Sequence, residues 1–159
     1  MTTASGVELT GVTLHPGLAA GRLLPLDAPL SFWGGSDLRT GRITDERHPQ
    51  CGVVMAGRIV VMHSGRGSSS SSSVLAEQIR AGVSPAAILL SQPDAVIVVG
   101  AIVAAELYGT CVPIVLLTPA EIDSLTHPVP AQVDASASGA RVRWAGPAAA
   151  PAIERITAR

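Results

Sequence analysis

The sequence predicts a single α/β domain in which mostly parallel central strands lie between flanking helices, with an antiparallel β portion from the chain ends. In the middle of the chain, short uncharged apolar runs alternate with helical patterns, which is typical of parallel strands joined by helices. At residues 6–26 and 131–145, apolar residues alternate with polar or small ones, as in antiparallel strands with one face in water. The 159 residues are 47% hydrophobic, enough for one core. We expect this domain over residues 1–145 and an Ala/Pro-rich tail at 146–159 that frays or lies on a partner.

The N-terminal β portion is expected to hold two strands, at residues 6–14 and 18–26. A His-Pro-Gly sequence at residues 15–17 provides the turn between them. Gly21 lies inside the second strand and predicts a β-bulge there.

A long loop follows at residues 30–50. It contains the only Phe of the chain, Phe32, and one of its two Trp residues, Trp33, together with three arginines. Loops of this length in a compact domain are usually functional or disordered, and the two aromatic residues argue against disorder. Two interpretations stay open: a loop packed on its own aromatic side chains, and a loop that faces a substrate.

The rest of the chain supplies the central elements. In order, we expect strands at residues 53–55 and 59–62, a helix ending near Gly82, strands at 86–90 and 95–99, a helix at 100–108 ended by Gly109, and a strand at 112–117.

Residues 64–73 read Ser-Gly-Arg-Gly followed by six serines, between an apolar strand and a helix. A helix start presents unpaired N–H groups and the positive end of the helix dipole, and glycine lets a ligand approach the backbone. Such a turn suits a carboxylate or phosphate, and it would also stabilise an ionised serine. A flexible serine linker is the alternative, but apolar strand and helix patterns flank the segment without a gap.

Several other site classes do not fit the sequence. The turn lacks the spacing and lysine of a P-loop and the second glycine of a Gly-x-Ser-x-Gly elbow. A Ser–His–Asp triad is not favoured, because only His63 of the four histidines lies near the turn and away from a proline. Cys51 and Cys111 are 60 positions apart, which indicates two reduced thiols rather than a disulfide or metal site.

The composition of the chain limits the classes of molecule that it is expected to bind. The net charge is −1, which gives no electrostatic basis for binding nucleic acid or an anionic membrane. All eleven basic residues are arginine, which excludes a Schiff-base lysine. The N-terminus shows no signal peptide, and the apolar run at 95–105 is too short to span a bilayer, so we expect a cytoplasmic chain. Low charge with a positive mean hydropathy indicates a surface that is partly covered, by a permanent partner or in an oligomer.

Several ordered motifs resemble one known family. They are Pro-Leu-Ser-Phe-Trp-Gly-Gly at residues 29–35 with Asp37, Gly-Arg-Ile at 41–43 with Asp45 and Arg-His-Pro at 47–49, Gly-Arg-Gly-Ser-Ser at 65–69, and residues 100–109. On these motifs the chain resembles the small subunit, or swivel domain, of the aconitase X enzymes. The resemblance implies a swivelling β/β/α domain that closes over a large catalytic subunit, as a heterodimer or larger assembly. It also implies that iron or an iron–sulfur cluster is held by that subunit, with no cofactor or metal bound by this chain alone.

The resemblance also assigns roles within the turn. In the wider aconitase superfamily the first serine of a Gly-Ser-Ser turn is the catalytic base, which corresponds to Ser68 here. The neighbouring Arg66, Gly67, Ser69 and Ser70 are then expected to bind substrate oxygen atoms. Ordinary aconitases carry an arginine two places after the base. Because this chain has Ser70 there, the carboxylate clamp is expected to be Arg66 or an arginine of the 30–50 loop.

The same resemblance points to the long loop as a possible substrate-facing segment. Its candidate residues are Trp33, Gly34, Gly35, Arg47 and His48.

The activity implied is dehydration of a hydroxy acid. Ser68 would remove a proton beside the carboxylate while the partner's metal polarises the leaving hydroxyl as a Lewis acid. The expected substrate is cis-3-hydroxy-L-proline, giving 1-pyrroline-2-carboxylate; the alternative is the small subunit of phosphomevalonate dehydratase. The serine run and the Ala/Arg-rich composition favour the bacterial, hydroxyproline group.

Functions of another class are a non-catalytic binding or regulatory module and a phosphohistidine carrier. Swivelling β/β/α domains occur as carriers in phosphoenolpyruvate-utilising enzymes, and residues 100–115 resemble them. The position of the carrier histidine is Val99 here, preceded by Val98. Neither side chain can hold a phosphoryl group, so the carrier function is not favoured.

Overall fold

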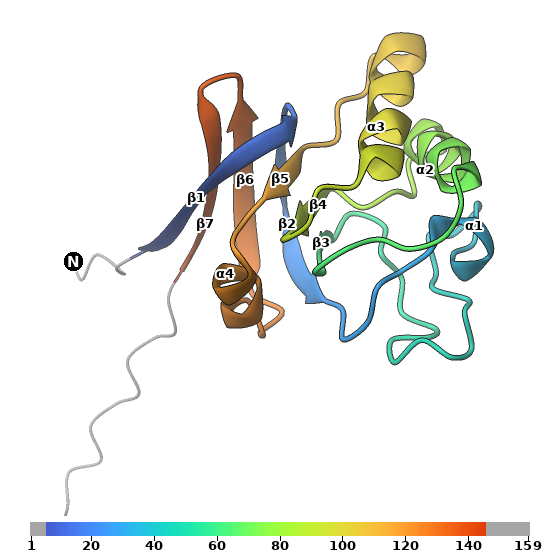
Figure 1. Ribbon diagram of the computed structural model, residues 1–159, viewed down its shortest axis with the longest axis horizontal. Coiled ribbons are helices and arrows are strands. Elements are labelled where there is room, and N and C mark those ends of the chain that lie inside the picture. The colour runs from blue at the N-terminus through green and yellow to red at the C-terminus, as the bar shows by residue number, and fades with distance from the viewer. Residues whose placement is uncertain (1–5, 146–159) are drawn as a thin grey trace, which may run out of the picture.

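The computed structural model of the chain describes residues 6–145. Seven strands and four helices follow one another in this range (Figure 1). They are β1 (Gly6–His15), β2 (Gly17–Pro25), α1 (Phe32–Gly35), β3 (Ile59–Val61), α2 (Ser70–Arg80), β4 (Ala87–Leu90), α3 (Ala95–Tyr108), β5 (Ile114–Leu116), α4 (Pro119–Ser124), β6 (Pro130–Ser136) and β7 (Gly139–Ala145). The expected tail at 146–159 lies outside the described residues.

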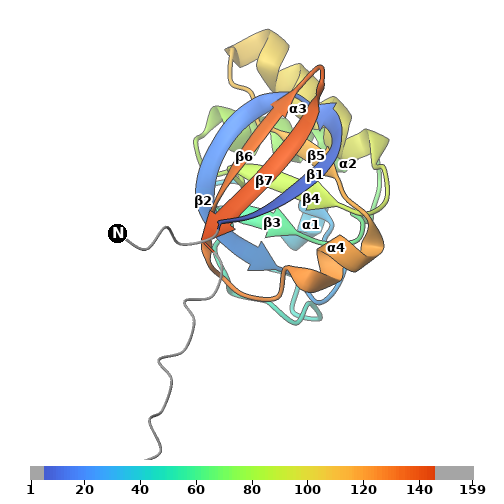
Figure 2. The same cartoon turned by 90° about the vertical axis from the view of Figure 1, so that its left-hand side faces the viewer.

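The strands close into a barrel with the order β1-β5-β4-β3-β2-β6-β7. Strands β2, β3, β4 and β5 pair in parallel with one another. Strand β1 pairs antiparallel with β5 and β7, and β6 pairs antiparallel with β2 and β7. The expectation of central parallel strands between two layers of helices is therefore corrected. Helices α2 and α3 cover one face of the parallel strands, and the antiparallel strands cover the other (Figures 1 and 2). This arrangement gives the three layers of a β/β/α domain.

The antiparallel half follows from the alternation in the sequence. Buried and exposed positions alternate along β6 and β7, and Val133 and Val142 pair across the two strands with both side chains buried. Both N-terminal strands are confirmed as well. The predicted bulge at Gly21 is wrong, because β2 pairs with β6 without a shift through this position. A Cβ at Gly21 would instead lie 2.5 Å from the Gly57 carbonyl oxygen, so glycine here permits a close backbone approach.

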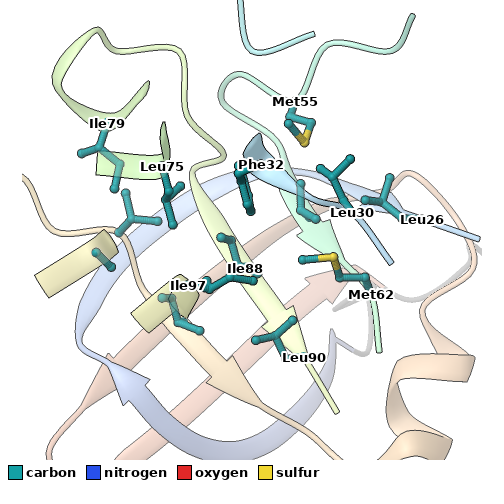
Figure 3. Packing of buried hydrophobic residues seen from close by; sticks show 14 of the residues in the cluster. Leu26, Leu30, Phe32, Met55, Met62, Leu75, Ile79, Ile88, Leu90 and Ile97 are labelled. Atoms are coloured by element: carbon teal, nitrogen blue, oxygen red, sulfur yellow. The ribbon is translucent and has the colours of Figure 1, made fainter. Parts of the chain in front are cut away.

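The parallel strands are buried on both faces and divide the core into two clusters. In the first, Ile88 and Leu90 of β4 meet Leu75 of α2 and Ile97 of α3 on the helical side (Figure 3). The second fills the barrel interior, where the other faces of β3, β4 and β5 meet β6 and β7. Strand β4 is completely buried because it takes part in both clusters.

The predicted strand at residues 95–99 is wrong, because these residues form the first turns of α3. The side chain of Asp94 accepts hydrogen bonds from the N–H groups of Val96 and Ile97 at 2.9 and 3.1 Å, which starts a helix at Ala95. Gly109 ends the helix at a positive φ of 67°, as predicted. An uncharged apolar run fits a buried strand and a buried helix equally well, and the Asp94 cap decides for the helix here.

Two further differences concern short elements. Residues 53–55 do not form a strand; Val54 makes only an isolated bridge to Arg42. Helix α4 was not expected, although its start carries a capping box: Thr118 bonds the Glu121 N–H and the Glu121 carboxylate bonds back to Thr118. The helices described over residues 6–145 include none that is long and apolar enough to cross a membrane.

Candidate functional site

The serine turn lies between β3 and α2, where the sequence predicts it, and it is exposed at Arg66, Gly67, Ser68, Ser69 and Ser70. The helix begins at Ser70 with Ser69 as its N-cap residue. The hydroxyls do not cap the helix, since Ser69 makes no side-chain cap hydrogen bond. Ser68 directly precedes the N-cap residue, so this exposed serine lies at the positive end of an eleven-residue helix.

The first turn of α2 uses some of its own N–H groups. Those of Ser71 and Ser72 donate to the carbonyl oxygens of Ser68 and Ser69 at 3.0 and 3.1 Å. The groups available to an outside anion are thus those nearer the turn, up to Ser70.

Gly67 has a φ of 102°, a conformation that favours glycine. A Cβ at this position would also collide with the hydroxyl of Ser31. Ser31 lies at the start of the long loop, and its hydroxyl is 3.4 Å from that of the buried Ser71. Gly67 thus gives the turn its shape in two ways, through its backbone angle and through its lack of a side chain.

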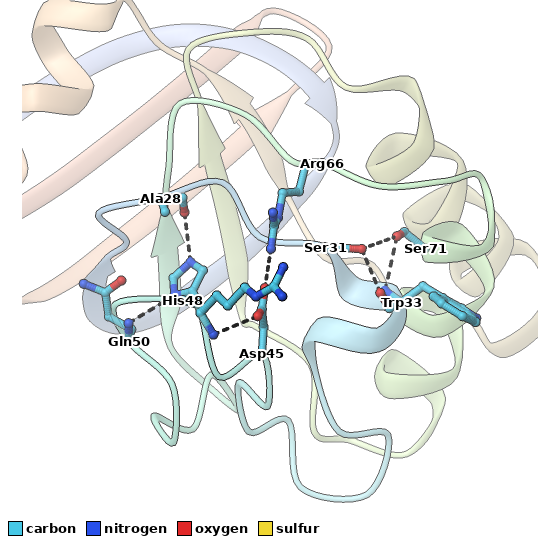
Figure 4. A network of polar contacts seen from close by, with 9 residues as sticks. Ala28, Ser31, Trp33, Asp45, His48, Gln50, Arg66 and Ser71 are labelled. Atoms are coloured by element: carbon cyan, nitrogen blue, oxygen red, sulfur yellow. Dashed lines mark hydrogen bonds and ion pairs between the residues drawn. The ribbon is translucent and has the colours of Figure 1, made fainter.

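Arg66 is fixed by both its backbone and its side chain. Its N–H donates to the Leu30 carbonyl at 3.1 Å, and Gly65 forms a parallel bridge with Leu30. Its guanidinium forms an ion pair with Asp45 of the long loop (Figure 4). The Arg47 N–H and the Arg66 guanidinium both favour the ionised carboxylate, which lowers the pKa of Asp45 below its ordinary value of 3.8.

The long loop is a packed structure, as the first of the two open interpretations proposed. Phe32 is 1% exposed and lies in the core beneath α2, together with Leu30, Ile43 and Met55 (Figure 3). The buried Gln78 of α2 holds the loop from the helical side, donating to the Ser36 hydroxyl at 2.9 Å.

His48 is a structural anchor of this loop. It is 4% exposed, its Nε2 lies 3.0 Å from the Ala28 carbonyl oxygen, and its Nδ1 accepts the Gln50 N–H at 3.1 Å (Figure 4). Both ring nitrogens are used within the chain, so the structure does not bring His48 to the surface with the other site candidates.

The other loop candidates differ in position. Trp33 is 60% exposed, and its ring points away from Asp45 and His48 (Figure 4). Gly34 is exposed with a φ of 74°, whereas Gly35 is buried. Arg47 is exposed, and its backbone N–H donates to Asp45 at 3.0 Å, so the backbone of Arg47 lies beside the ion pair of Asp45 and Arg66. The second open interpretation is compatible with Trp33, Gly34 and Arg47 and stays a prediction.

Sequence reasoning did not single out Ser31, Ser71 or Asp45 as site residues. The N–H of Trp33 donates to the Ser71 hydroxyl at 3.2 Å, and the Ser31 hydroxyl donates to the Trp33 carbonyl at 2.8 Å. The contact between Trp33 and Ser71 joins segments 38 positions apart, so no local spacing in the sequence predicts it. The one available signal was the acidic pair Asp45-Glu46 between Arg42 and Arg47 of the loop.

A separate Ser–His–Asp array lies at the ends of the parallel strands. His63, just after β3, places Nδ1 2.7 Å from the Ser91 hydroxyl and Nε2 3.0 Å from Asp123 of α4. The N–H groups of Ser91 and Gln92 both donate to the His63 carbonyl, so they are not free to stabilise an oxyanion at Ser91. The array therefore fits a structural role, in which His63 links the residues just before the serine turn to Ser91 and Asp123, and does not fit a hydrolytic triad.

The donor set of the turn does not fit an iron or iron–sulfur centre. Residues 64–73 offer serine hydroxyls and one guanidinium, whereas such centres take thiolate, imidazole or carboxylate ligands. Between residues 6 and 145, no group of three or more His, Cys, Asp or Glu side chains is placed to hold a metal ion. No chemical step through a metal is therefore derived from this chain.

Comparison with known proteins agrees with the fold. The aconitase X swivel domain family matches residues 8–142. The cis-3-hydroxy-L-proline dehydratase of Pseudomonas aeruginosa is 49% identical over 105 residues, which cover 66% of this chain and 18% of that protein. The phosphomevalonate dehydratase small subunit of Methanopyrus kandleri is 41% identical over 73 residues, covering 46% of this chain and 54% of that one.

A solved structure of aconitase X from Thermococcus kodakaraensis superposes with a TM-score of 0.76 at 28% identity, covering 87% of this chain and 98% of that one. The chain spans less than a fifth of the cis-3-hydroxy-L-proline dehydratases that it matches. Since the family match extends over most of the chain and the solved structure shares its fold, this chain belongs to the aconitase X family as a swivel domain.

Proposed function

We propose that this chain is the swivel part of an aconitase-X-type dehydratase and supplies the catalytic serine to a larger metal-bearing partner. The observation that carries the proposal is the exposed Ser68 at the start of α2, held by the Gly67 turn within a swivel domain of this family. The partner follows from the names of its relatives, which are dehydratases or their small subunits. The exposed turn is half of a site, so we expect no turnover from this chain alone.

In the proposed reaction, Ser68 accepts the proton from the carbon next to the substrate carboxylate. The positive end of the α2 dipole and the N–H groups at the helix start favour the ionised serine. The electron pair of the broken C–H bond forms a carbon–carbon double bond, and the hydroxyl on the adjacent carbon leaves. Arg66 holds the carboxylate by charge-assisted hydrogen bonds and so fixes which C–H bond faces Ser68.

We propose cis-3-hydroxy-L-proline as the substrate. The support is that two dehydratases of this name are 49% and 37% identical to the chain over the largest aligned shares among the relatives compared, 66% and 72%. Mevalonate 5-phosphate is the alternative, since phosphomevalonate dehydratase small subunits are also similar, at 33–41% identity.

The test is a dehydration assay on the chain co-purified with its large partner, with each of the two substrates. We expect turnover with cis-3-hydroxy-L-proline and none when either component is omitted. If the complex turns over mevalonate 5-phosphate but not cis-3-hydroxy-L-proline, mevalonate 5-phosphate becomes the proposed substrate. Turnover by this chain without its large partner would contradict the proposal.

The phosphocarrier alternative has a separate test. The carrier position, Val99, is an exposed residue within α3. Incubation with phosphoenolpyruvate and the enzymes that transfer its phosphoryl group should leave the chain unlabelled. An acid-labile phosphate on any histidine would favour the carrier function over the dehydratase.

A further inference from the structure

The ion pair between Arg66 and Asp45 has a one-sided geometry. The Asp45 side chain is 18% exposed and that of Arg66 is 54% exposed, so the acidic partner is largely covered while the arginine side chain is more than half open to solvent. Asp45 Oδ2 receives the Arg66 Nη2–H, and Oδ1 receives the Arg47 N–H at 3.0 Å. Asp45 is therefore fixed on both oxygens, and it holds only one edge of the guanidinium.

The rest of Arg66 is fixed as well. Its own N–H bonds to Leu30, so the backbone and the tip of this long side chain are both attached to the loop at residues 30–50. A free arginine at the surface loses considerable rotamer freedom when it binds a ligand. Here that ordering is already present before any substrate arrives.

Asp45 also sets the charge that a substrate meets. The lowered pKa of Asp45 keeps it ionised throughout the neutral range, so the pair carries no net charge. An approaching monocarboxylate still finds the open N–H groups of Arg66. For a dianionic phosphate both the attraction to Arg66 and the repulsion by Asp45 are about doubled, so the Asp45 charge removes more binding energy from a dianion than from a monocarboxylate.

We propose that Asp45 is a positioning and specificity-determining residue, which aims Arg66 at the substrate carboxylate and favours a singly charged carboxylate over a dianionic phosphate at this position. The inference rests on the proposed function, in which Arg66 is the carboxylate clamp. It adds a residue outside the serine turn, and it assigns the anion class that the clamp accepts.

The test compares Asp45→Asn and Asp45→Glu with a matched control, Asp37→Asn. Asp37 belongs to the same loop and its pKa is also lowered, first by the Thr40 hydroxyl and then by the Arg39 N–H, but it does not contact Arg66. In the complex with the large partner, the measured quantities are kcat, KM for the hydroxy acid, and Ki for inorganic phosphate. In the full chain alone, nitrogen-15 NMR of the Arg66 Nε–H follows titrations with acetate and with inorganic phosphate.

For Asp45→Asn we expect KM to rise about three- to tenfold through lost ordering of Arg66, with kcat changed less. The Ki for phosphate should fall about threefold or more, because the repelling charge is gone. In the chain alone, the Arg66 signal should respond more strongly to phosphate than in the wild type. Asp45→Glu keeps the negative charge, so its KM and its Ki for phosphate should lie closer to the wild-type values than those of Asp45→Asn. Asp37→Asn should change neither quantity.

Opposite changes in KM and Ki separate this role from a purely structural one, which would weaken both ligands together. Equal weakening of both, or no difference from Asp37→Asn, would overturn the inference. If the complex yields no turnover, the NMR titration decides: an unchanged phosphate response in Asp45→Asn contradicts the proposal. A different result would contradict the proposed function itself. The Ser68→Ala complex would then keep full turnover, or the Arg66→Ala complex would keep the wild-type KM.

Discussion

The backbone N–H of Trp33 donates a 3.2 Å hydrogen bond to the hydroxyl of Ser71, which joins the long loop to the first turn of α2. Ser71 is 3% exposed and Trp33 is 60% exposed, so the contact lies just under the surface beside the candidate site. The serine turn is consequently supported from the loop side as well as by its own helix. Substitutions in the loop are expected to reach the turn through this contact and through the Arg66–Asp45 pair.

Replacing Ser68 with Ala should reduce turnover of the complex by about 10²- to 10⁴-fold, because the general base is removed. Association with the large partner and the thermal stability of the chain should stay unchanged, since Ser68 is exposed. Steady-state kinetics and co-purification provide the measurements. Ser73→Ala is the control: its hydroxyl donates to the Ser70 carbonyl at 2.9 Å inside the helix, and we expect near-normal turnover. Equal losses in both variants would mean that the serine run matters only for the helix.

Replacing Gly67 with Ala should destabilise the turn by about 1–3 kcal/mol, the usual effect of a strained backbone conformation, and more where Ser31 cannot move aside. Gly52→Ala is a matched control, because Gly52 also has a positive φ, 89°, but a Cβ there would meet no atom within 4 Å. Chemical denaturation of the two variants separates backbone strain, which they share, from the collision with Ser31. A smaller loss in Gly67→Ala than in Gly52→Ala would show that the turn adapts easily.

Stability of the long loop should fall in acid. The folded-state pKa values of Asp45 and Asp37 are lowered below 3.8, so the stabilisation that they provide is present above that pH and is lost as pH falls through the lowered values. Thermal melts between pH 2 and 7 should show a steeper decline in the wild type than in the Asp37→Asn/Asp45→Asn double variant. Parallel curves would show that these carboxylates do not contribute to acid sensitivity.

Phe32 and Trp33 are adjacent aromatic residues of the loop, but the first is buried and the second is exposed. Their replacement by Ala should therefore change the stability of the chain to different extents. Phe32→Ala should cost about 3–5 kcal/mol of folding free energy, because a 1% exposed ring is lost from the core. Trp33→Ala should change the stability of the isolated chain by less than about 1 kcal/mol, as its ring is mostly exposed. Urea denaturation measures both, and a large loss in Trp33→Ala would place its ring in a structural role.

Asp94→Ala tests the helix that replaces the expected strand. Loss of the N-cap should lower stability by about 1 kcal/mol and fray the start of α3. Glu106→Ala, an exposed change near the end of the same helix, should have little effect. Hydrogen exchange at Val98 and Val99 gives a local readout, and protection unchanged from the wild type would contradict the role assigned to Asp94.

The patterns that were read correctly have local causes. The alternation around Val133 and Val142 fixes antiparallel strands, and Gly82 and Gly109 follow helices whose last turns need a positive φ beyond them. The segment at residues 95–99 was misread because five apolar residues satisfy a strand and a helix alike, and the cap at Asp94 acts over only three positions. Barrel closure was not visible at all, since the pairing of β1 with both β5 and β7 joins distant parts of the chain.

By itself the sequence determined the serine turn, because its glycines and serines act through the backbone between an apolar strand and a helix. It also carried the motifs that lead to the family, and from these comes the proposal that Ser68 is the base. Only the tertiary structure decided which side chains surround the turn. Asp45 and Ser31 reach it from the long loop, through contacts with Arg66 and Ser71 across 21 and 40 positions. His48 is buried because both of its ring nitrogens contact groups within the chain, the Ala28 carbonyl and the Gln50 N–H. Such contacts depend on how the loop packs over Phe32, and no local spacing in the sequence encodes that packing.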